Sequence, residues 1–558
     1  MVPDAGARRA GRLRSRIAAR AGLLCLALCL AAGPASEAAP GEPLPSDAEL
    51  VARGTVIGEI LVRNENIFDI ADPKEDNRLF RLANRLHAKT RPWVIRGQLL
   101  FRSGDPYDPR LLEESERILR SNNYLYDARI RPVAFGDGRV DVEVRTRDVW
   151  TLNPGISFGR KGGANTTSVD FEELNLAGTG IGIGAARAST PDRDTFSVFL
   201  KTGRIADTWI RTDLVLSENS DGRTRRAQLE RPFYSLNTRW AASVSYADDL
   251  RVDTLFGREG VAGTFQTRAE KQGVAAGWSP GLKGRWVRRY RAGFTRDASR
   301  FAPAPGDVPS DPVPPDRILA YPWIGFELVE DAFETARNRD QIARTEDFFL
   351  GTRLLAALGY SSSAFGGDRE AAVVSSVFGT GFRPAESTTV LVEAAADGRY
   401  EGGSVRDAVL STVDRLYVRL AERWLAFFLL SARRGVNLDL DHELALGGET
   451  GLRGYPRKYQ AGDRSVLFTV EGRYYSKLYI FRLFHLGGAA FFDMGRAWGG
   501  GFARAPDPGV LRNVGAGLRI GNARSGLGQV IHVDVAFPLD GDPSISRIQF
   551  VVETKVGF

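Results

Sequence analysis

Residues 548–558 read Ile548-Gln549-Phe550-Val551-Val552-Glu553-Thr554-Lys555-Val556-Gly557-Phe558, and their side chains alternate in character. On an extended strand, successive side chains point to opposite faces. One face carries Ile548, Phe550, Val552, Val556 and Phe558, and the other carries Gln549, Glu553, Lys555 and Gly557. A strand of about 10 residues with an apolar and a charged face is typical of a transmembrane β-barrel. We expect Val556 and Phe558 to form the C-terminal signal of such a barrel.

The same alternation recurs in many short segments after Val149. Clear examples are 238–246, 464–475 and 531–537, which are separated by Gly- and Asp-rich turns. A soluble β-sandwich would alternate in the same way, so periodicity alone leaves both folds open. The recurring charged face and the large number of tandem strands favour a closed barrel, which has no free edge. We predict an all-β transmembrane barrel over residues 149–558; a direct count gives about 18 to 19 strands, whereas barrels of this type have even numbers.

Composition excludes several other classes of protein. The chain has 558 residues, 43% of them hydrophobic and 26% charged, which is ordinary for a folded protein. The longest uncharged apolar run, 21–32, is too short for a transmembrane helix, and this excludes a polytopic helical membrane protein.

The N-terminal residues resemble a secretory signal peptide, predicted over residues 1–38. Six arginines precede an apolar stretch, which is followed by small residues up to Ala39. Both cysteines, Cys25 and Cys29, lie in this segment, so disulfides and thiol chemistry are not expected in the mature chain. Leu24 and Leu28 precede them, which argues against lipid attachment. Cleavage would leave a nearly balanced charge, so no nucleic-acid partner is expected.

A small α+β module is predicted at residues 53–148, after a Pro-rich linker at 39–52. The expected order is a strand at 57–67, helices at 77–87 and 108–122, and strands at 128–135 and 139–147. Asp108-Pro109 supplies a helix start, and Gly136-Asp137-Gly138 supplies a hairpin turn.

The most distinctive segment is Gly447-Gly448-Glu449-Thr450-Gly451-Leu452-Arg453-Gly454-Tyr455-Pro456, in a long connection at about 442–463. Considered alone, an arginine between loop glycines is most often solvated. However, Leu452-Arg453-Gly454-Tyr455 resembles the Arg-Gly-aromatic loop motif of the outer-membrane protein assembly (BamA/TamA-like) superfamily, bacterial surface antigen type, which includes two-partner-secretion transporters. The segment 488–495, with Phe491, Asp493 and Gly495, resembles that family's G-x-x-F-x-D-x-G strand, and Glu471 and Arg473 match its E-x-R strand. Five strands expected after the loop also fit: about 464–478, 483–498, 511–521, 529–538 and 546–558.

The resemblance implies a 16-stranded barrel whose sixth loop folds back into the lumen, preceded at 53–148 by a single POTRA module in the periplasm. Inside a lumen, Arg453 would need a carboxylate partner, and Asp493 lies on the lumen-facing side of its strand. A planar guanidinium suits a bidentate pair of this kind. We expect the pair to be structural or gating.

The expected function is insertion, assembly or translocation of client polypeptides at the bacterial outer membrane. Expected partners are unfolded outer-membrane or secreted proteins, periplasmic proteins at the POTRA module, and outer-membrane lipid. Glycines and Pro154 weaken the first barrel strand, and this favours a seam between the first and last strands that opens. The alternative is a passive pore or structural barrel without insertase activity.

Enzymatic activity is not expected, and neither is a cofactor or a metal. Gly155-Ile156-Ser157-Phe158-Gly159 matches G-x-S-x-G, but it lies in a predicted strand with no helix after it, whereas a nucleophile elbow needs that helix. The four histidines (87, 442, 485 and 532) show no metal-ligand spacing.

Overall fold

A computed structural model describes residues 44–257, 260–305, 313–499, 507–526, 530–540, 543 and 545–555. The predicted signal peptide, Val556 and Phe558 therefore lie outside the described residues. The chain divides into two compact units. The first contains the residues up to Ile60, Ser103–Asp108 and Pro132–Val142, and the second contains Leu61–Arg102, Pro109–Arg131 and Glu143–Phe558.

From residue 44 onward, the described part of the segment before the barrel contains four helices and a three-stranded sheet of order β1-β3-β2. Their bounds are α2 Asp47–Ala52, β1 Val56–Glu65, α3 Arg78–Leu86, α4 Pro92–Arg96, α5 Pro109–Arg120, β2 Leu125–Gly136 and β3 Arg139–Asp148. Both predicted helices and all three predicted strands are present, whereas α2 and α4 were not predicted. Helix α2 occupies part of the expected linker because Ser46 and Glu49 form a capping box at its start.

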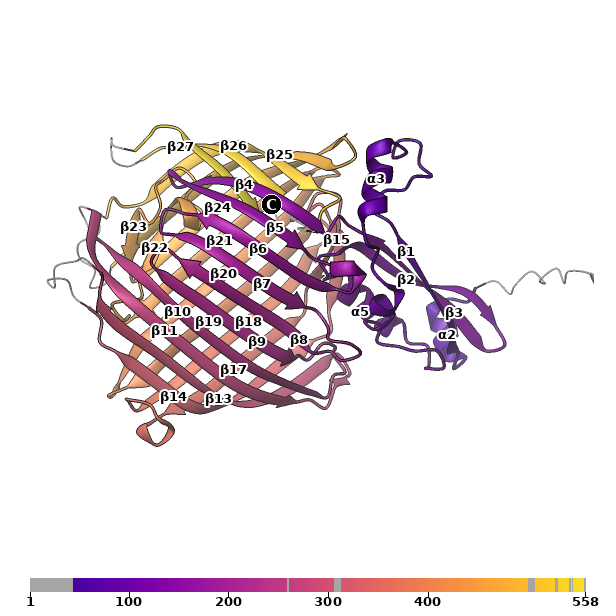
Figure 1. Cartoon of the computed structure of the whole chain (residues 1–558), viewed down its shortest axis with the longest axis horizontal. Coiled ribbons are helices and arrows are strands. Elements are labelled where there is room, and N and C mark those ends of the chain that lie inside the picture. Colours follow the sequence, from indigo (N-terminus) through magenta and orange to yellow (C-terminus); the bar gives the residue numbers. More distant parts are fainter. Residues whose placement is uncertain are drawn as a thin grey trace, which may run out of the picture. The chain divides into compact units, whose positions relative to one another are not determined.

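The described residues after Asp148 form a closed antiparallel barrel of twenty strands (Figure 1). These strands are β4 Leu152–Lys161, β5 Ala164–Glu173, β6 Ile181–Ser189, β7 Asp194–Thr202, β8 Arg211–Asn219, β9 Gly222–Arg231, β10 Trp240–Gly257, β11 Gly260–Trp278, β13 Trp286–Pro303, β14 Arg317–Glu330, β17 Thr352–Ser361, β18 Ala371–Ala385, β19 Thr388–Glu401, β20 Ser404–Ala421, β21 Trp424–Val436, β24 Arg464–Ile480, β25 Phe484–Trp498, β26 Leu511–Asn522, β27 Val530–Pro538 and β28 Gln549–Lys555. The two-residue strand β12, Leu282–Lys283, pairs with β13.

The strand number corrects the expectation of sixteen. Five strands follow the connection at 437–463, as predicted, so the four additional strands precede it. That connection is consequently the eighth, and not the sixth, of the turns at its end of the barrel. We call this end, where β21 leads into β24, the loop end, and the opposite end, where β4 begins, the module end.

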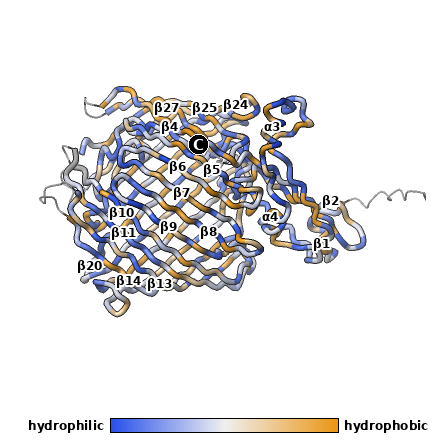
Figure 2. The backbone as a smooth tube through the Cα atoms, viewed as in Figure 1, coloured by the Kyte–Doolittle hydropathy of each residue, from blue (hydrophilic) through white to orange (hydrophobic). Residues whose placement is uncertain are grey.

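Alternation within each strand separates a polar lumen from an apolar outer surface, and Figure 2 shows the two colours alternating along the strands. On β24, Thr469, Glu471 and Arg473 are buried in the lumen, while Val466 on the opposite face is 36% exposed. In the sheet before the barrel, Asp137 and Gly138 adopt the positive φ angles that the β2–β3 hairpin requires.

Two long connections carry structure of their own. At the loop end, the connection between β21 and β24 contains β22 Leu444–Leu446, η3 Gly448–Thr450 and β23 Gln460–Gly462. At the module end, the connection between β14 and β17 contains a hairpin of β15 Phe333–Arg337 and β16 Thr345–Phe349. The remaining short helices are η1 Leu176–Gly178 and η2 Ser363–Phe365. None of the helices in the described ranges is long and apolar enough to cross a membrane.

Candidate functional site: the lumen loop and the barrel seam

The connection at 437–463, which we call the lumen loop, is tied to the barrel wall at its start by arginines. Arg399 donates to both carboxylate oxygens of Asp439, at 2.8 and 2.9 Å, and Arg317 pairs with Asp441 at 2.7 Å. His442 contacts Asp407 at 2.8 Å, and this hydrogen bond raises the pKa of His442 above its ordinary value. The loop therefore enters the lumen from a fixed point.

Apolar side chains then hold the loop against the inner wall. Leu446, Leu452 and Tyr455 from the loop are almost fully buried with wall residues that include Leu467 and Leu511. Burying side chains of this size contributes about 1.5–3 kcal/mol each. This packing places Arg453, between two of them, in the interior of the barrel.

Arg453 is 5% exposed and its guanidinium faces three carboxylates. Its Nε and Nη2 atoms donate to the two oxygens of Asp493, both at 2.8 Å, and Nη1 donates to Glu471 at 2.9 Å. The third carboxylate, Asp534, lies 3.5 Å from Nη1. Although burial opposes the charged form, Asp493 and its neighbours keep the pKa of Arg453 above its ordinary value. The carbon at the centre of the guanidinium also lies 3.3 Å from the centre of the Phe491 ring, a cation–π contact.

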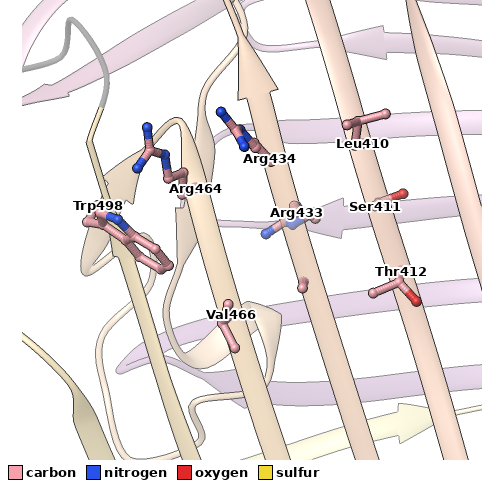
Figure 3. Close-up of a pocket in the computed structure, with 9 residues that line it drawn as sticks. Leu410, Ser411, Thr412, Arg433, Arg434, Arg464, Val466 and Trp498 are labelled. Carbon is pink, nitrogen blue, oxygen red and sulfur yellow. The ribbon is translucent and has the colours of Figure 1, made fainter.

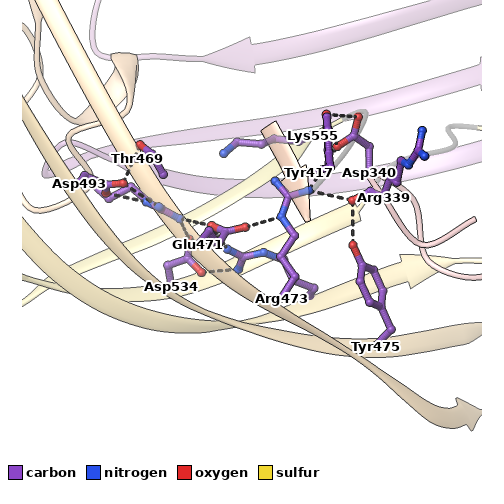
Figure 4. Close-up of polar contacts among 12 residues, drawn as sticks. Arg339, Asp340, Tyr417, Thr469, Glu471, Arg473, Tyr475, Asp493, Asp534 and Lys555 are labelled. Atoms are coloured by element: carbon purple, nitrogen blue, oxygen red, sulfur yellow. Dashed lines mark hydrogen bonds and ion pairs between the residues drawn. The ribbon is translucent and has the colours of Figure 1, made fainter. Parts of the chain in front are cut away.

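Glu471 connects Arg453 to a wider charged network. It accepts from Arg473 at 2.9 Å and lies 3.3 Å from Arg519, which in turn pairs with Asp534 (Figure 4). These groups come from β24, β26 and β27 and are at most 5% exposed on their side chains. Buried charges that are fully paired are tolerated, but removing one leaves the others uncompensated.

Close backbone approach explains two glycines of the predicted motifs. The Gly454 amide donates to Asn513 Oδ1 at 3.1 Å, and a Cβ at Gly454 would lie 2.6 Å from the Asn513 Cβ. A Cβ at Gly495 would lie 2.8 Å from the Val466 carbonyl and 3.0 Å from Leu446. Beside Gly454, the Tyr455 hydroxyl donates to the carbonyl of Arg512 at 2.7 Å.

The barrel closes between β28 and β4, and we call this junction the seam. Within the described residues, the two strands pair at a single position, Val552 opposite Arg160, whereas β28 pairs with β27 at seven positions and β4 pairs with β5 at ten. An ion pair between Lys161 and Glu553, at 2.9 Å, adds to the junction. Near the start of β4, Trp150 bonds to the β26–β27 turn instead, donating to the Arg524 carbonyl at 2.6 Å.

The lumen loop contacts strands on both sides of the seam. Arg453 and Gly454 bind β24–β27, as described above. On the other side, the Arg457 amide donates to the carbonyl of Gly162, in the β4–β5 turn, at 3.1 Å. The Arg457 side chain pairs with Asp192 in the next turn, at 2.7 Å. The loop therefore bridges the junction that has the fewest paired positions among the described barrel strands.

Sequence reasoning missed the hairpin β15–β16, whose turn enters the lumen from the module end. The Arg339 carbonyl accepts from Arg473 at 2.8 Å and from Tyr475 at 2.7 Å. Asp340 accepts from Tyr417 at 3.1 Å, and Ile342 is buried against Tyr417 and its neighbours. The segment 338–344 has no strand-like alternation, and no sequence signal places it there.

The hairpin is also bound to the segment before the barrel, through contacts within the second unit. Arg120 of α5 donates to both oxygens of Asp347, at 2.7 and 2.8 Å. Arg344 donates to the Leu125 carbonyl at 3.1 Å. Burial raises the pKa of Glu346 in β16 to about 7, although backbone amides of residues 339–341 donate to its carboxylate.

Of the residues considered for enzymatic or metal chemistry, Ser157, His87 and His485 lie apart from this network, whereas His442 belongs to the lumen loop and His532 is the cross-strand partner of Arg519. Ser157 is in the middle of strand β4, where its Oγ contacts the Oγ of Ser168 at 2.6 Å. His87 contacts Asp148 at 2.9 Å before the barrel, and His485 and His532 lie on β25 and β27.

No protein-family model matches the chain, and comparison with curated proteins gives no match. Among solved structures, the chain is similar to CdiB from Escherichia coli, with 13% identity, a TM-score of 0.45 and coverage of 98% of both chains. It is similar to CdiB from Acinetobacter baumannii, with 11% identity, a TM-score of 0.44 and coverage of 90% of this chain and 73% of that one. It is also similar to BamA from Haemophilus ducreyi lacking POTRA domains 1–3, with 11% identity, a TM-score of 0.38 and coverage of 89% and 85%.

Proposed function

We propose that this protein is a bacterial outer-membrane barrel that opens at its seam to insert or translocate client polypeptides. The observation that carries the proposal is that β4 and β28 share a single paired position within the described residues. On the edge of β4 that faces β28, the described residues supply no other partner, and an unpaired edge offers backbone N–H and C=O groups to an incoming strand. A client strand would pair with β4 after the seam opens.

The outer surface of the barrel supports the membrane location. Outward-facing residues such as Ile156 (88% exposed), Ile324 (67%) and Leu420 (66%) would be unfavourable in water over so large a surface. Near the module end, Trp240, Trp278, Tyr290 and Phe326 follow one another on β10, β11, β13 and β14, with paired positions in register. Aromatic rows of this kind lie at membrane–water interfaces. We propose that this row marks the periplasmic interface, because the segment proposed below as a POTRA module precedes β4 at the module end.

The sheet before the barrel supports a receiving role. Its order, β1-β3-β2, places β1 and β2 at the two edges. Edge strands bind extended peptides by adding a strand through main-chain hydrogen bonds. We propose that this segment is a POTRA module and that client strands bind one of these edges before they reach the seam.

The lumen loop and the module-end hairpin supply the control that such a seam requires. The loop bridges the seam, and its Arg453 shares Glu471 with Arg473, which the hairpin contacts in turn. Opening the seam must move or strain these contacts. The network would therefore keep the resting barrel closed until pairing with a client strand compensates for the loop and network contacts that opening breaks.

A passive pore is the second candidate, and one observation favours it. The lumen holds a cavity of about 790 Å³ lined by charged and polar groups that include Lys271, Arg291 and Asp397. A cavity of this size, with charged groups in its lining, suits small solutes without any opening of the wall. The two functions differ in whether the seam must separate.

A disulfide across the seam distinguishes the two functions. The register places Val552 opposite Arg160, so Arg160→Cys with Val552→Cys is the locking pair. Ser157→Cys with Ser168→Cys is the matched control, because it joins β4 to β5 without crossing the seam. An insertase should lose client assembly in the oxidised locking variant, regain it on reduction, and keep it in the control. Full activity with the seam locked would leave the passive pore as the better account.

A further inference from the structure

A groove of about 410 Å³ lies on the outer surface of the barrel, near the loop end. Its side chains come from β20, β21, β24 and β25, and Figure 3 shows Arg434, Arg464 and Trp498 next to one another there. The contacts of Arg433 show which face of the wall is which. Arg433 donates to Ser465 and to the Ala445 carbonyl of the lumen loop, so its side chain points into the lumen. Arg434 and Arg464, one residue along each strand, therefore point outward.

The two arginines are direct cross-strand partners, Arg434 opposite Arg464. Like charges in this arrangement repel and destabilise a sheet. Within the described residues, no carboxylate pairs with Arg434, and the one that pairs with Arg464 is its chain neighbour Asp463, at 3.5 Å with the arginine side chain 48% exposed. The groove thus holds two adjacent cations with little compensation.

Two other outward arginines at the same end are neutralised by the protein itself. Arg496 on β25 makes two hydrogen bonds to Asp507, at 2.6 and 3.1 Å. Arg512 on β26 makes two to Asp540, at 2.6 and 2.9 Å. The contrast indicates that the charge at Arg434 and Arg464 is compensated by an anion from outside the chain.

The surroundings of the arginines define the kind of anion. Leu410 is 52% exposed and Val466 36%, and both line the groove together with the Trp498 ring. Further along the same outward face, Leu430 lies opposite Phe468. An anion bound by Arg434 and Arg464 would therefore lie next to apolar side chains, and the head group of a lipid likewise carries its charge next to acyl chains. The guanidinium group of arginine binds phosphate through paired hydrogen bonds, which the phosphate oxygens of a lipid head group can accept.

We infer that this groove binds the phosphorylated head group of a lipid A-type glycolipid, with acyl chains along the apolar strip below. The inference rests on the membrane placement proposed above, which puts the loop end in the outer leaflet. A phosphate between Arg434 and Arg464 removes their repulsion, and Trp498 provides a flat surface for a sugar ring. Lipid binding here requires no opening of the seam, so it is independent of whether the protein inserts clients or is a passive pore.

The test measures lipid A binding to the full-length protein in detergent by native mass spectrometry. We expect the doubly phosphorylated lipid to bind the unchanged protein, and the Arg434→Gln/Arg464→Gln variant to bind it at least tenfold more weakly. The single variant Arg434→Gln should show an intermediate loss. The matched control is Arg512→Gln, which removes an outward arginine that already has a partner, and it should change binding less than twofold. Heat-modifiable mobility on gels checks that each variant is folded.

Three results would overturn the inference. One is equal binding by the double variant and the unchanged protein. Another is equally tight binding of fully dephosphorylated lipid A, which lacks the phosphate, or of phosphatidylglycerol, which lacks the sugar rings proposed to lie on Trp498. The third is displacement of the lipid by inorganic phosphate at equal concentration, which would identify a site for the free anion. None of these results depends on client assembly.

Discussion

Replacing Arg453 with alanine should destabilise the barrel strongly, because the change leaves buried carboxylates without their partner. Asp493 would lose two hydrogen bonds and retain only Thr469 and Asn513 as donors, and Glu471 would lose one of its three arginine neighbours. Removing one member of a buried pair costs about 3–5 kcal/mol. We expect a loss of this size in the free energy of unfolding.

The double-mutant cycle separates pairing from simple loss of packing. Asp493→Ala alone should cost a similar amount, since it leaves Arg453 buried without its bidentate partner. The double variant should cost little more than either single one, with about 2–3 kcal/mol of non-additivity. Arg496→Ala is the control: its pair with Asp507 is exposed by 38% and 45%, so about 0–1 kcal/mol is expected.

Urea unfolding in lipid vesicles, followed by tryptophan fluorescence and by heat-modifiable mobility, measures these differences. Strictly additive effects of Arg453→Ala and Asp493→Ala would refute the reasoning, because they would mean that the two groups do not depend on each other. A cost for Arg453→Ala no larger than that for Arg496→Ala would show that the guanidinium is solvated.

Three further predictions concern the lumen loop and the hairpin. Gly454→Ala should destabilise by about 1–3 kcal/mol because its Cβ would meet Asn513, while Gly472→Ala, with no atom within 4 Å, should be nearly neutral in the same unfolding assay. Asp340→Ala should raise single-channel conductance in planar bilayers, because the hairpin turn loses its contacts with Tyr417 and Arg473; Asp76→Ala, which breaks an exposed pair, is the control. Because burial raises the pKa of Glu346 from 4.5 to about 7, the folded hairpin favours the protonated acid, so stability should fall as pH rises from about 4.5 to 7. Hydrogen exchange at residues 339–341 should follow that fall, and Glu346→Gln should flatten it; a rise in protection over this range would contradict the assignment.

The sequence predicted the strands after the lumen loop well, because each combines strict alternation with clear turns. The predicted 464–478, 483–498 and 511–521 differ from β24, β25 and β26 by at most two residues at either end. The strand number was wrong because a resemblance carries a family's count and cannot register additional hairpins. The additional hairpins lie before the lumen loop, in a part of the chain where no motif fixes the strand register.

The candidate site was predicted only in part, for a geometric reason. One contact, Arg453 with Asp493, follows from a single inward-facing position on one strand. The convergence of Glu471, Arg519 and Asp534 depends on how β24, β26 and β27 are staggered in the closed barrel, which no local pattern specifies. The hairpin turn at 338–344 was missed because its polar residues read as an ordinary loop, whereas its carbonyl and carboxylate groups pair with side chains more than 70 residues away.

Direct detection of a client strand on β4 tests the central claim most sharply. A cysteine at Ile156, in the part of β4 that has no β28 partner among the described residues, would be oxidised in the presence of a urea-denatured eight-stranded barrel protein. Single cysteines would be moved along the client's last strand. The account predicts disulfides at every second client position, as side-chain alternation in a paired strand requires, and their loss when Arg160→Cys/Val552→Cys locks the seam. Crosslinks without this periodicity, or crosslinks that persist in the locked barrel, would contradict it.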